Sequence, residues 1–172
     1  MNGYFKSKTL AEKAAWDYIE KLPEGEKFEL VTINPVFIQG PSICSGDGFS
    51  ENWMKGMLDG SKEKIPRSNF AFVDVRDCAI AHLKAVQVPE AAGKRFLTSG
   101  HDAWIKEVAD ALIAKFPNLK VPRELEEGEN KDPGFPCDNT SSRQVLGLEY
   151  RSLADTMCDC AQSLIDRGIV KP

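Results

Sequence analysis

The 172-residue chain is long enough for one domain with a real core, and its mix of 42% hydrophobic and 28% charged residues is that of an ordinary globular protein. Its net charge of −4 gives no basic surface for nucleic acid, and no run of about 18 apolar residues predicts a membrane span. No signal peptide is expected ahead of the first helical segment. The five cysteines are irregularly spaced, which favours free thiols in a reducing, cytoplasmic compartment and no metal site.

Residues 3–22 predict the first helix. Good helix formers dominate this segment, its apolar residues recur at helical spacing, and Pro23 and Gly25 follow it. On such a helix, Tyr4 and Lys8 are four residues apart and share one face. A positive charge close to a phenol favours loss of its proton, so the pair could exchange a proton with a carbonyl or an alcohol. Because the pattern is short, a surface tyrosine beside a surface lysine is the alternative interpretation.

The next segments alternate between strand and helix patterns. The stretch KFELVTINP contains a short apolar run that ends at a proline, and it predicts a strand at 29–34 that is buried on both faces. Residues 40–69 predict a loop that contains one short helix. FAFVDV predicts a further strand, and a helix at 75–87 follows it. Asp74 is the expected N-cap of this helix, and Asp77 is expected to complete a capping box.

The remaining sequence continues the α/β pattern. GKRFLTSG predicts a strand at 94–98, and a helix at 103–116 with Asp102 as its N-cap follows it. Two shorter helical segments come after a Pro- and Glu-rich loop. The first is ended by Gly147 and the second is capped by Ser152.

Four stretches in this order resemble one known family: YFKSKTLAEKAAW, LVTINPVFIQGP, FAFVDVRDCAIAHLKAV and LGLEYRSLADT. They are similar to the extended short-chain dehydrogenases/reductases, and most similar to the dihydroflavonol-4-reductase-like branch of the NAD-dependent epimerase/dehydratase family. The resemblance implies an α/β fold, the C-terminal portion of a Rossmann-type enzyme with a small substrate-binding region. No Gly-rich turn stands ahead of Tyr4, so the N-terminal Gly-rich half is expected to be absent.

The resemblance also implies a domain organisation. We expect a single incomplete domain over residues 1–172. The catalytic helix and a core strand are expected in residues 1–39. Residues 40–172 are expected to form mainly the substrate-binding region, with one further core strand near 94–98. That strand should lie parallel to the strand at 29–34, because a long crossover joins them.

The resemblance further assigns roles to particular residues. Tyr4 takes the place of the proton donor, and Lys8 takes the place of the lysine that tunes it and holds the nicotinamide ribose. Pro35 and Ile38 correspond to the segment that holds the nicotinamide carboxamide, although a proline that simply ends the strand would explain Pro35 equally well. Ser50 is the candidate contact to the cofactor phosphates. The implied cofactor is NADP, as NADPH, bound only together with the missing N-terminal half.

Two functions of different class follow from these patterns. The first is an NADP-dependent reductase of a small aldehyde or ketone, inactive as this fragment alone. The second is a non-enzymatic remnant or interaction module that keeps part of the fold. A nucleotide-sugar epimerase or dehydratase is a third possibility, but the FVDVRDCAIAHLKAV stretch favours the reductase branch. The sequence leaves open the particular carbonyl substrate, the preference between NAD and NADP, and the oligomeric state.

Overall fold

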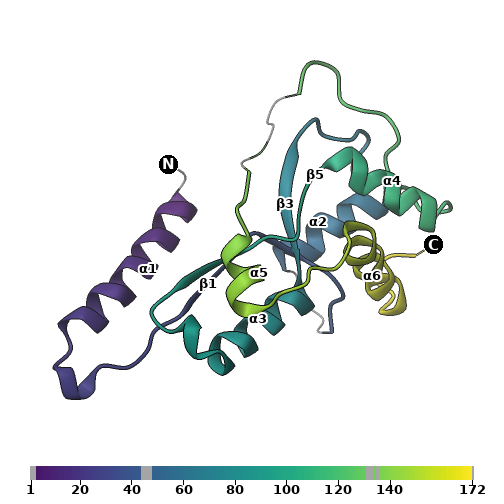
Figure 1. The fold of residues 1–172 in the computed structure, drawn as a ribbon. Helices are drawn as coiled ribbons and strands as arrows, with labels where there is room; N and C mark the ends of the chain where they lie inside the picture. The colour runs from purple at the N-terminus through teal and green to yellow at the C-terminus, as the bar shows by residue number, and fades with distance from the viewer. Residues whose placement is uncertain (1–2, 44–47, 131–133, 135, 172) are drawn as a thin grey trace.

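The computed structural model describes residues 3–43, 48–130, 134 and 136–171. Figure 1 shows α1 at one side of the molecule, with α2, α4 and α6 gathered around β3 and β5. The helices and strands follow in the order α1 (Gly3–Lys21), β1 (Thr32–Pro35), β2 (Phe37–Gln39), α2 (Phe49–Leu58), β3 (Asn69–Asp74), α3 (Val75–Gln87), β4 (Arg95–Thr98), β5 (His101–Trp104), α4 (Ile105–Lys115), α5 (Thr140–Leu146) and α6 (Leu153–Asp166). Two short 3₁₀ turns, Glu24–Glu26 and Pro89–Ala91, lie between them.

The strands form two small sheets that share two extended segments. In the first sheet β1 and β4 are parallel, and in the second β3 lies between a parallel β2 and an antiparallel β5. Only Val36 separates β1 from β2, and only Ser99 and Gly100 separate β4 from β5. Each extended segment therefore runs through both sheets. A backbone hydrogen bond from Val36 N to the Thr98 carbonyl (3.1 Å) joins the two segments at the crossing, and one from Gly100 N to the Phe72 carbonyl (2.7 Å) joins the second segment to β3.

The predicted strands at 29–34 and 94–98 lie side by side and parallel, as β1 and β4. The first of them differs from its prediction: it spans Thr32–Pro35 and not 29–34, and its residues are half-buried or exposed, not buried on both faces. The chain does not enter a loop after Pro35 but forms β2 one residue later, so that Ile38 pairs with Val73 of β3. A proline lacks the amide hydrogen that a sheet ladder needs, so a break in the pairing at this point is expected, but extended backbone continues beyond it.

Two predicted helix caps are wrong. Asp102 does not cap α4, because it lies within β5 opposite Ala71. The helix begins two residues later, where the Glu107 carboxylate accepts a hydrogen bond from the backbone N–H of Trp104 (2.8 Å). Asp74 does cap α3, by accepting from Arg76 N (2.8 Å), but Asp77 does not complete a capping box. Its buried carboxylate accepts from Arg151 N instead (2.8 Å).

The main core lies where α2, α4 and α6 pack against β3 and β5. Each of these helices contributes one apolar stripe at helical spacing. The stripe of α4 illustrates the pattern, with its buried residues at positions i, i+3, i+4 and i+7: Ile105, Val108, Ala109 and Leu112. A smaller cluster joins α3, α5 and β4 around Phe96, which is fully buried. The helices that follow β2 thus build one main core and one smaller cluster against the strands.

Helix α1 is held differently, because none of its residues is buried. Its main polar attachment is Glu12, whose Oε1 accepts hydrogen bonds from Arg95 Nε (2.8 Å) and from the Thr32 hydroxyl (3.2 Å). The hydrogen bond from the Arg95 guanidinium is the main cause that lowers the pKa of Glu12 to about 2. This one carboxylate therefore fastens the middle of α1 to the first residues of β1 and β4.

We predict that Glu12→Gln loosens α1 without unfolding the rest of the chain. Loss of the charged pair should cost about 1 kcal/mol, since Arg95 is largely exposed to solvent. Amide hydrogen exchange should accelerate in α1 and stay unchanged in β3 and α4. Glu20→Gln, an exposed change on the same helix, is the control and should leave exchange unaltered.

The stabilisation of α1 by the Glu12–Arg95 ion pair should also depend on pH. Because the folded pKa lies below the ordinary value of 4.5, its contribution is present above that pH and is lost as the pH falls toward 2. Protection of α1 that does not change between pH 5 and about pH 2.5 would contradict this assignment.

Candidate functional site

The proposed catalytic pair lies on the exposed first turns of α1. The Lys8 ammonium nitrogen lies 5.5 Å from the centre of the Tyr4 ring, so the two side chains share one helical face as the spacing predicts. The Tyr4 side chain is 62% exposed, which leaves its ring open to a ligand. A phenol and an ammonium group in this arrangement can donate a proton and stabilise the resulting phenolate.

The direction of α1 carries this pair toward the carboxyl end of β1. In Figure 1, α1 and β1 run in opposite directions, so the N-terminal end of the helix points the same way as the end of the strand. Glu12 fixes the position of α1 along β1, because it contacts Thr32 at the beginning of the strand. Tyr4 lies eight residues before Glu12, which on a helix is about 12 Å. Ligands of open α/β sheets bind outside the carboxyl ends of the strands.

Two of the proposed cofactor-binding residues, Pro35 and Ile38, lie in the consecutive strands β1 and β2. Pro35 is the exposed last residue of β1 and pairs with Thr98 of β4, while Ile38 is half-buried in the middle of β2. The Thr98 hydroxyl is buried and has no hydrogen-bond partner among the described residues. A buried hydroxyl without a hydrogen-bond partner is uncommon, so the Thr98 hydroxyl at the end of β4 could bind a ligand or a water molecule.

Ser50 lies apart from the strands, in the first turn of α2, where it is half-buried. The two regions are connected through Gln39, the last residue of β2, whose side-chain Nε2 donates to the Ser50 carbonyl (3.4 Å). The structure thus brings Tyr4 and Lys8 into one pair and links Ile38 to Ser50 through Gln39.

A buried carboxylate that sequence reasoning treated only as a helix cap organises the region behind these residues. The side chain of Asp74 is fully buried and accepts from Arg76 Nε (2.9 Å) and Nη2 (2.7 Å). Burial by itself would raise the pKa of Asp74, but the hydrogen bonds from Arg76 and from Thr156 outweigh it and hold the pKa below its ordinary value. Arg76 also donates to Asp159 of α6 (2.7 Å).

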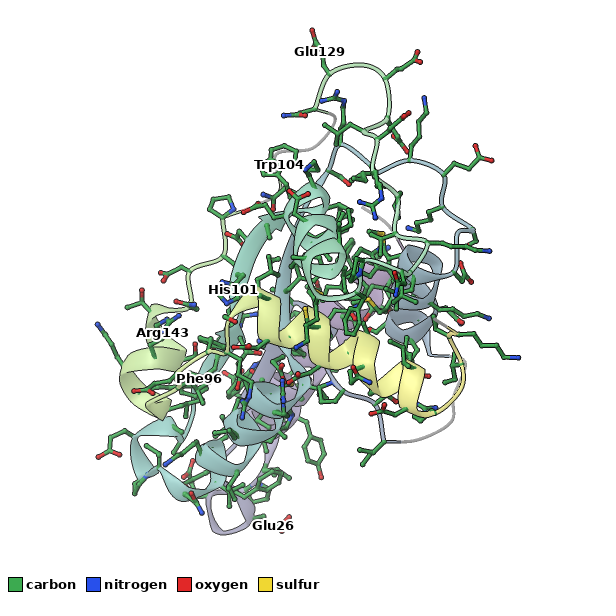
Figure 2. The ribbon with its side chains drawn as sticks, turned by 90° about the vertical axis from the view of Figure 1, so that its right-hand side faces the viewer. Glu26, Phe96, His101, Trp104, Glu129 and Arg143 are labelled. Carbon is green, nitrogen blue, oxygen red and sulfur yellow. The ribbon has the colours of Figure 1, made fainter. Side chains whose placement is uncertain are left out.

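A second buried carboxylate, Asp77, holds the segment that leads into α6. It binds both the backbone N–H and the guanidinium of Arg151. The carbonyl of Arg151 lies 2.7 Å from Nε2 of His101 in β5. Figure 2 shows His101 beside the beginning of α6, which lies across the face toward the viewer. α6 is therefore fixed to α3 and β5 at its N-terminal end.

Within the part of the chain that the structure describes, no three His, Cys, Asp or Glu side chains come close enough to hold a metal ion. Among these residues there is also no helix with the length and apolar character needed to cross a membrane.

Several known proteins similar to this chain are reductases. NADPH-dependent methylglyoxal reductase Gre2 of Saccharomyces cerevisiae is 34% identical over 175 residues, which cover 96% of this chain and 51% of the relative. Tetraketide α-pyrone reductase 1 of Arabidopsis thaliana is 33% identical, with 96% and 48% covered. The crystal structure of Gre2 from Candida albicans in complex with NADPH matches with a TM-score of 0.78 at 30% identity, over 96% of this chain and 52% of that one. No family model matches the chain.

The α/β fold of the chain is that of the corresponding part of the Rossmann-type reductases it matches. The chain is similar to these enzymes over nearly its whole length, which confirms the predicted resemblance to the C-terminal part of an extended short-chain dehydrogenase/reductase. It spans about half the length of the curated relatives it matches.

We predict that the two carboxylates bound to Arg76 contribute unequally to stability. Asp74→Asn leaves the buried site without its charge and should lower the free energy of unfolding by about 2–3 kcal/mol. Asp159→Asn is the matched control. Because Asp159 is half exposed, its removal should cost less than about 1 kcal/mol. Urea unfolding followed by circular dichroism measures both values, and equal losses would contradict the assigned role of Asp74.

Proposed function

We propose that this chain forms the catalytic-helix and substrate-binding part of an NADPH-dependent reductase of small aldehydes or ketones. The observation that carries the proposal is the Tyr4–Lys8 pair, exposed on one face of α1 at the end of the helix that points the same way as the carboxyl end of β1. The similarity to reductases at 33–34% identity supports this reading over an epimerase or dehydratase. In this proposal, residues 40–172 contribute mainly the substrate-binding region, with one further core strand near 94–98.

In the proposed mechanism, the Tyr4 hydroxyl donates its proton to the substrate's carbonyl oxygen as that oxygen gains negative charge. NADPH, when bound, supplies the hydride that converts the carbonyl carbon to an alcohol carbon. The Lys8 ammonium stabilises the phenolate that Tyr4 leaves behind. Hydride and proton together reduce the carbonyl to an alcohol, so the step is balanced.

The residues near the strand ends fit one end of such a cofactor. Pro35 and Ile38 would hold the nicotinamide carboxamide, Lys8 would hold its ribose, and Ser50 would contact a phosphate. The exposed ring of Pro35 and the unsatisfied Thr98 hydroxyl support a ligand at this edge. A Gly-rich turn that seats a pyrophosphate on a helix N-terminus is not part of this sequence, so these residues would bind only part of the cofactor.

The alternative proposal is a non-enzymatic remnant or interaction module. One observation favours it, the absence of any buried residue on α1, since a catalytic helix needs a fixed position. Under either proposal a cytoplasmic location fits the cysteine pattern of the sequence.

We predict that the 172-residue chain alone does not bind NADPH tightly. Its proposed contacts reach mainly the nicotinamide end, and most charge of the cofactor lies on its phosphates. Titration calorimetry should give no saturable binding at micromolar concentrations. A low-micromolar dissociation constant would overturn this prediction.

We predict that Tyr4 is essential in a completed enzyme, in which the N-terminal half of the yeast methylglyoxal reductase is fused ahead of α1. This fusion should reduce an aldehyde with NADPH. Tyr4→Phe should lower kcat by about 10²–10⁴-fold and leave NADPH binding largely intact, because only the proton donor is removed. Lys8→Ala should lower kcat and also weaken NADPH binding, and Lys8→Arg should be intermediate, since it keeps the charge with a different reach.

Tyr18→Phe is the matched control for Tyr4→Phe. Tyr18 is similarly exposed (60%) on the same helix but lies at the other end, so its hydroxyl should not affect kcat. Near-full activity of Tyr4→Phe at every pH would show that the helix pair is only a surface contact, and would favour the non-enzymatic alternative.

A further inference from the structure

A polar stripe runs along α6 beside its apolar core face. Its members are separated by four, three and four residues, which places them in one line on a helix. We define the polar stripe as Thr156, Cys160, Ser163 and Arg167, the last being the C-cap residue of the helix. The core face of the same helix is formed by Met157, Ala161 and Leu164, all fully buried.

Three members of the polar stripe contact the last residue of β2 and the segments that follow it. The Cys160 thiol donates to Oε1 of Gln39 (3.5 Å). The Ser163 hydroxyl oxygen accepts from the backbone N–H of Ser42 (3.1 Å). The Arg167 guanidinium pairs with the carboxylate of Glu51 in the first turn of α2 (2.6 Å). Three successive turns of α6 thus hold the exit of β2 and the beginning of α2.

The fourth member connects the polar stripe to the buried Asp74 carboxylate, to which Thr156 donates a hydrogen bond. Asp74 in turn lies against Gly40. A Cβ atom on Gly40 would come within 3.2 Å of the Asp74 carboxylate oxygen, and its φ of +125° is one that other residues rarely adopt. The chain therefore leaves β2 in a narrow passage between β3 and α6.

The contacts at the centre of this passage are shielded from water. Gln39 is 2% exposed and Cys160 is 3% exposed. Burial raises the pKa of the Cys160 thiol to about 11, so the thiol stays protonated and can donate. Buried polar groups reduce stability unless they are hydrogen-bonded, so a stripe of this kind needs partners on the facing segment to be tolerated.

We propose that the polar stripe of α6 consists of positioning residues, which hold the β2 exit and the first turn of α2 in the arrangement that binds the cofactor. The inference rests on the proposed function, because Ile38 and Ser50 stand directly beside the held residues Gln39 and Glu51. α6 is anchored in the core through its apolar face, so its position is fixed, and its polar stripe can hold these segments in place. The polar stripe contacts neither substrate nor cofactor and acts through the segments that do.

The first test uses the chain as it exists and needs no activity. Hydrogen–deuterium exchange is measured over residues 37–43 and 48–54 in Cys160→Val and Ser163→Ala. Both variants should exchange faster there, by about tenfold, while β4 and α4 keep their protection. Cys160→Ser retains a donor and should restore slow exchange. Gln162→Ala, on the exposed side of the same helix, is the control and should change nothing in these segments.

The second test uses the completed enzyme described above. Ser163→Ala and Cys160→Val should raise the apparent KM for NADPH by about fivefold and leave kcat within about twofold, because binding geometry changes while the proton donor does not. A general loss of folding would instead lower the amount of active enzyme and leave KM unaltered, so the two effects are separable.

Unchanged exchange in both variants overturns the proposal, and so does a loss of kcat at constant KM. If the completed enzyme reduces no carbonyl, the proposed function fails, but the exchange experiment still decides whether the polar stripe holds these segments. Local loosening in the variants, with rescue by Cys160→Ser, supports the positioning role.

Discussion

The buried carboxylate of Asp74 is the interaction on which the rest of the arrangement depends. It ends β3, caps α3 and lies against Gly40 at the exit of β2. A charge without water must be surrounded by donors, and here Arg76 and Thr156 supply them from two helices. The need to satisfy this one buried charge therefore helps to position the strand, both helices and the β2 exit, together with the apolar core.

The crossing of two extended segments between the sheets explains how a small chain presents several strand ends together. Val36 and Gly100 mark the crossing points. Val36 donates a backbone hydrogen bond to Thr98 of the other segment, and Gly100 donates one to Phe72 of β3. The parallel pair β1 and β4 ends there, and the second sheet with its three covering helices begins. The proposed cofactor edge thus lies at the boundary between a Rossmann-like pair of strands and the region proposed to bind substrate.

Helix α1 contrasts with this tightly held boundary. The helices around β3 bury whole apolar stripes, whereas α1 is fastened mainly by the carboxylate of Glu12 and exposes the rings of Tyr4 and Phe5. Exposure makes the Tyr4–Lys8 pair accessible, but catalysis also needs a fixed geometry. The two proposed functions differ on this point, since a reductase requires α1 to be held more firmly than these contacts hold it.

The sequence by itself determined the helices, the parallel strand pair and the Tyr4–Lys8 face, because hydrophobic periodicity, glycine and proline breaks and i,i+4 spacing are local properties. It also predicted the resemblance to short-chain reductases, through four motifs in order. Only the tertiary structure decided that Asp102 belongs to a strand, that Asp77 pairs with Arg151, and that the polar residues of α6 face the β2 exit. Those outcomes depend on partners 31 to 121 residues away, as the pairing of Asp102 with Ala71 and the contact of Cys160 with Gln39 illustrate. A local sequence pattern for a cap or a helix cannot reveal such partners, because the energy of a buried polar group depends on the groups that contact it in the folded chain.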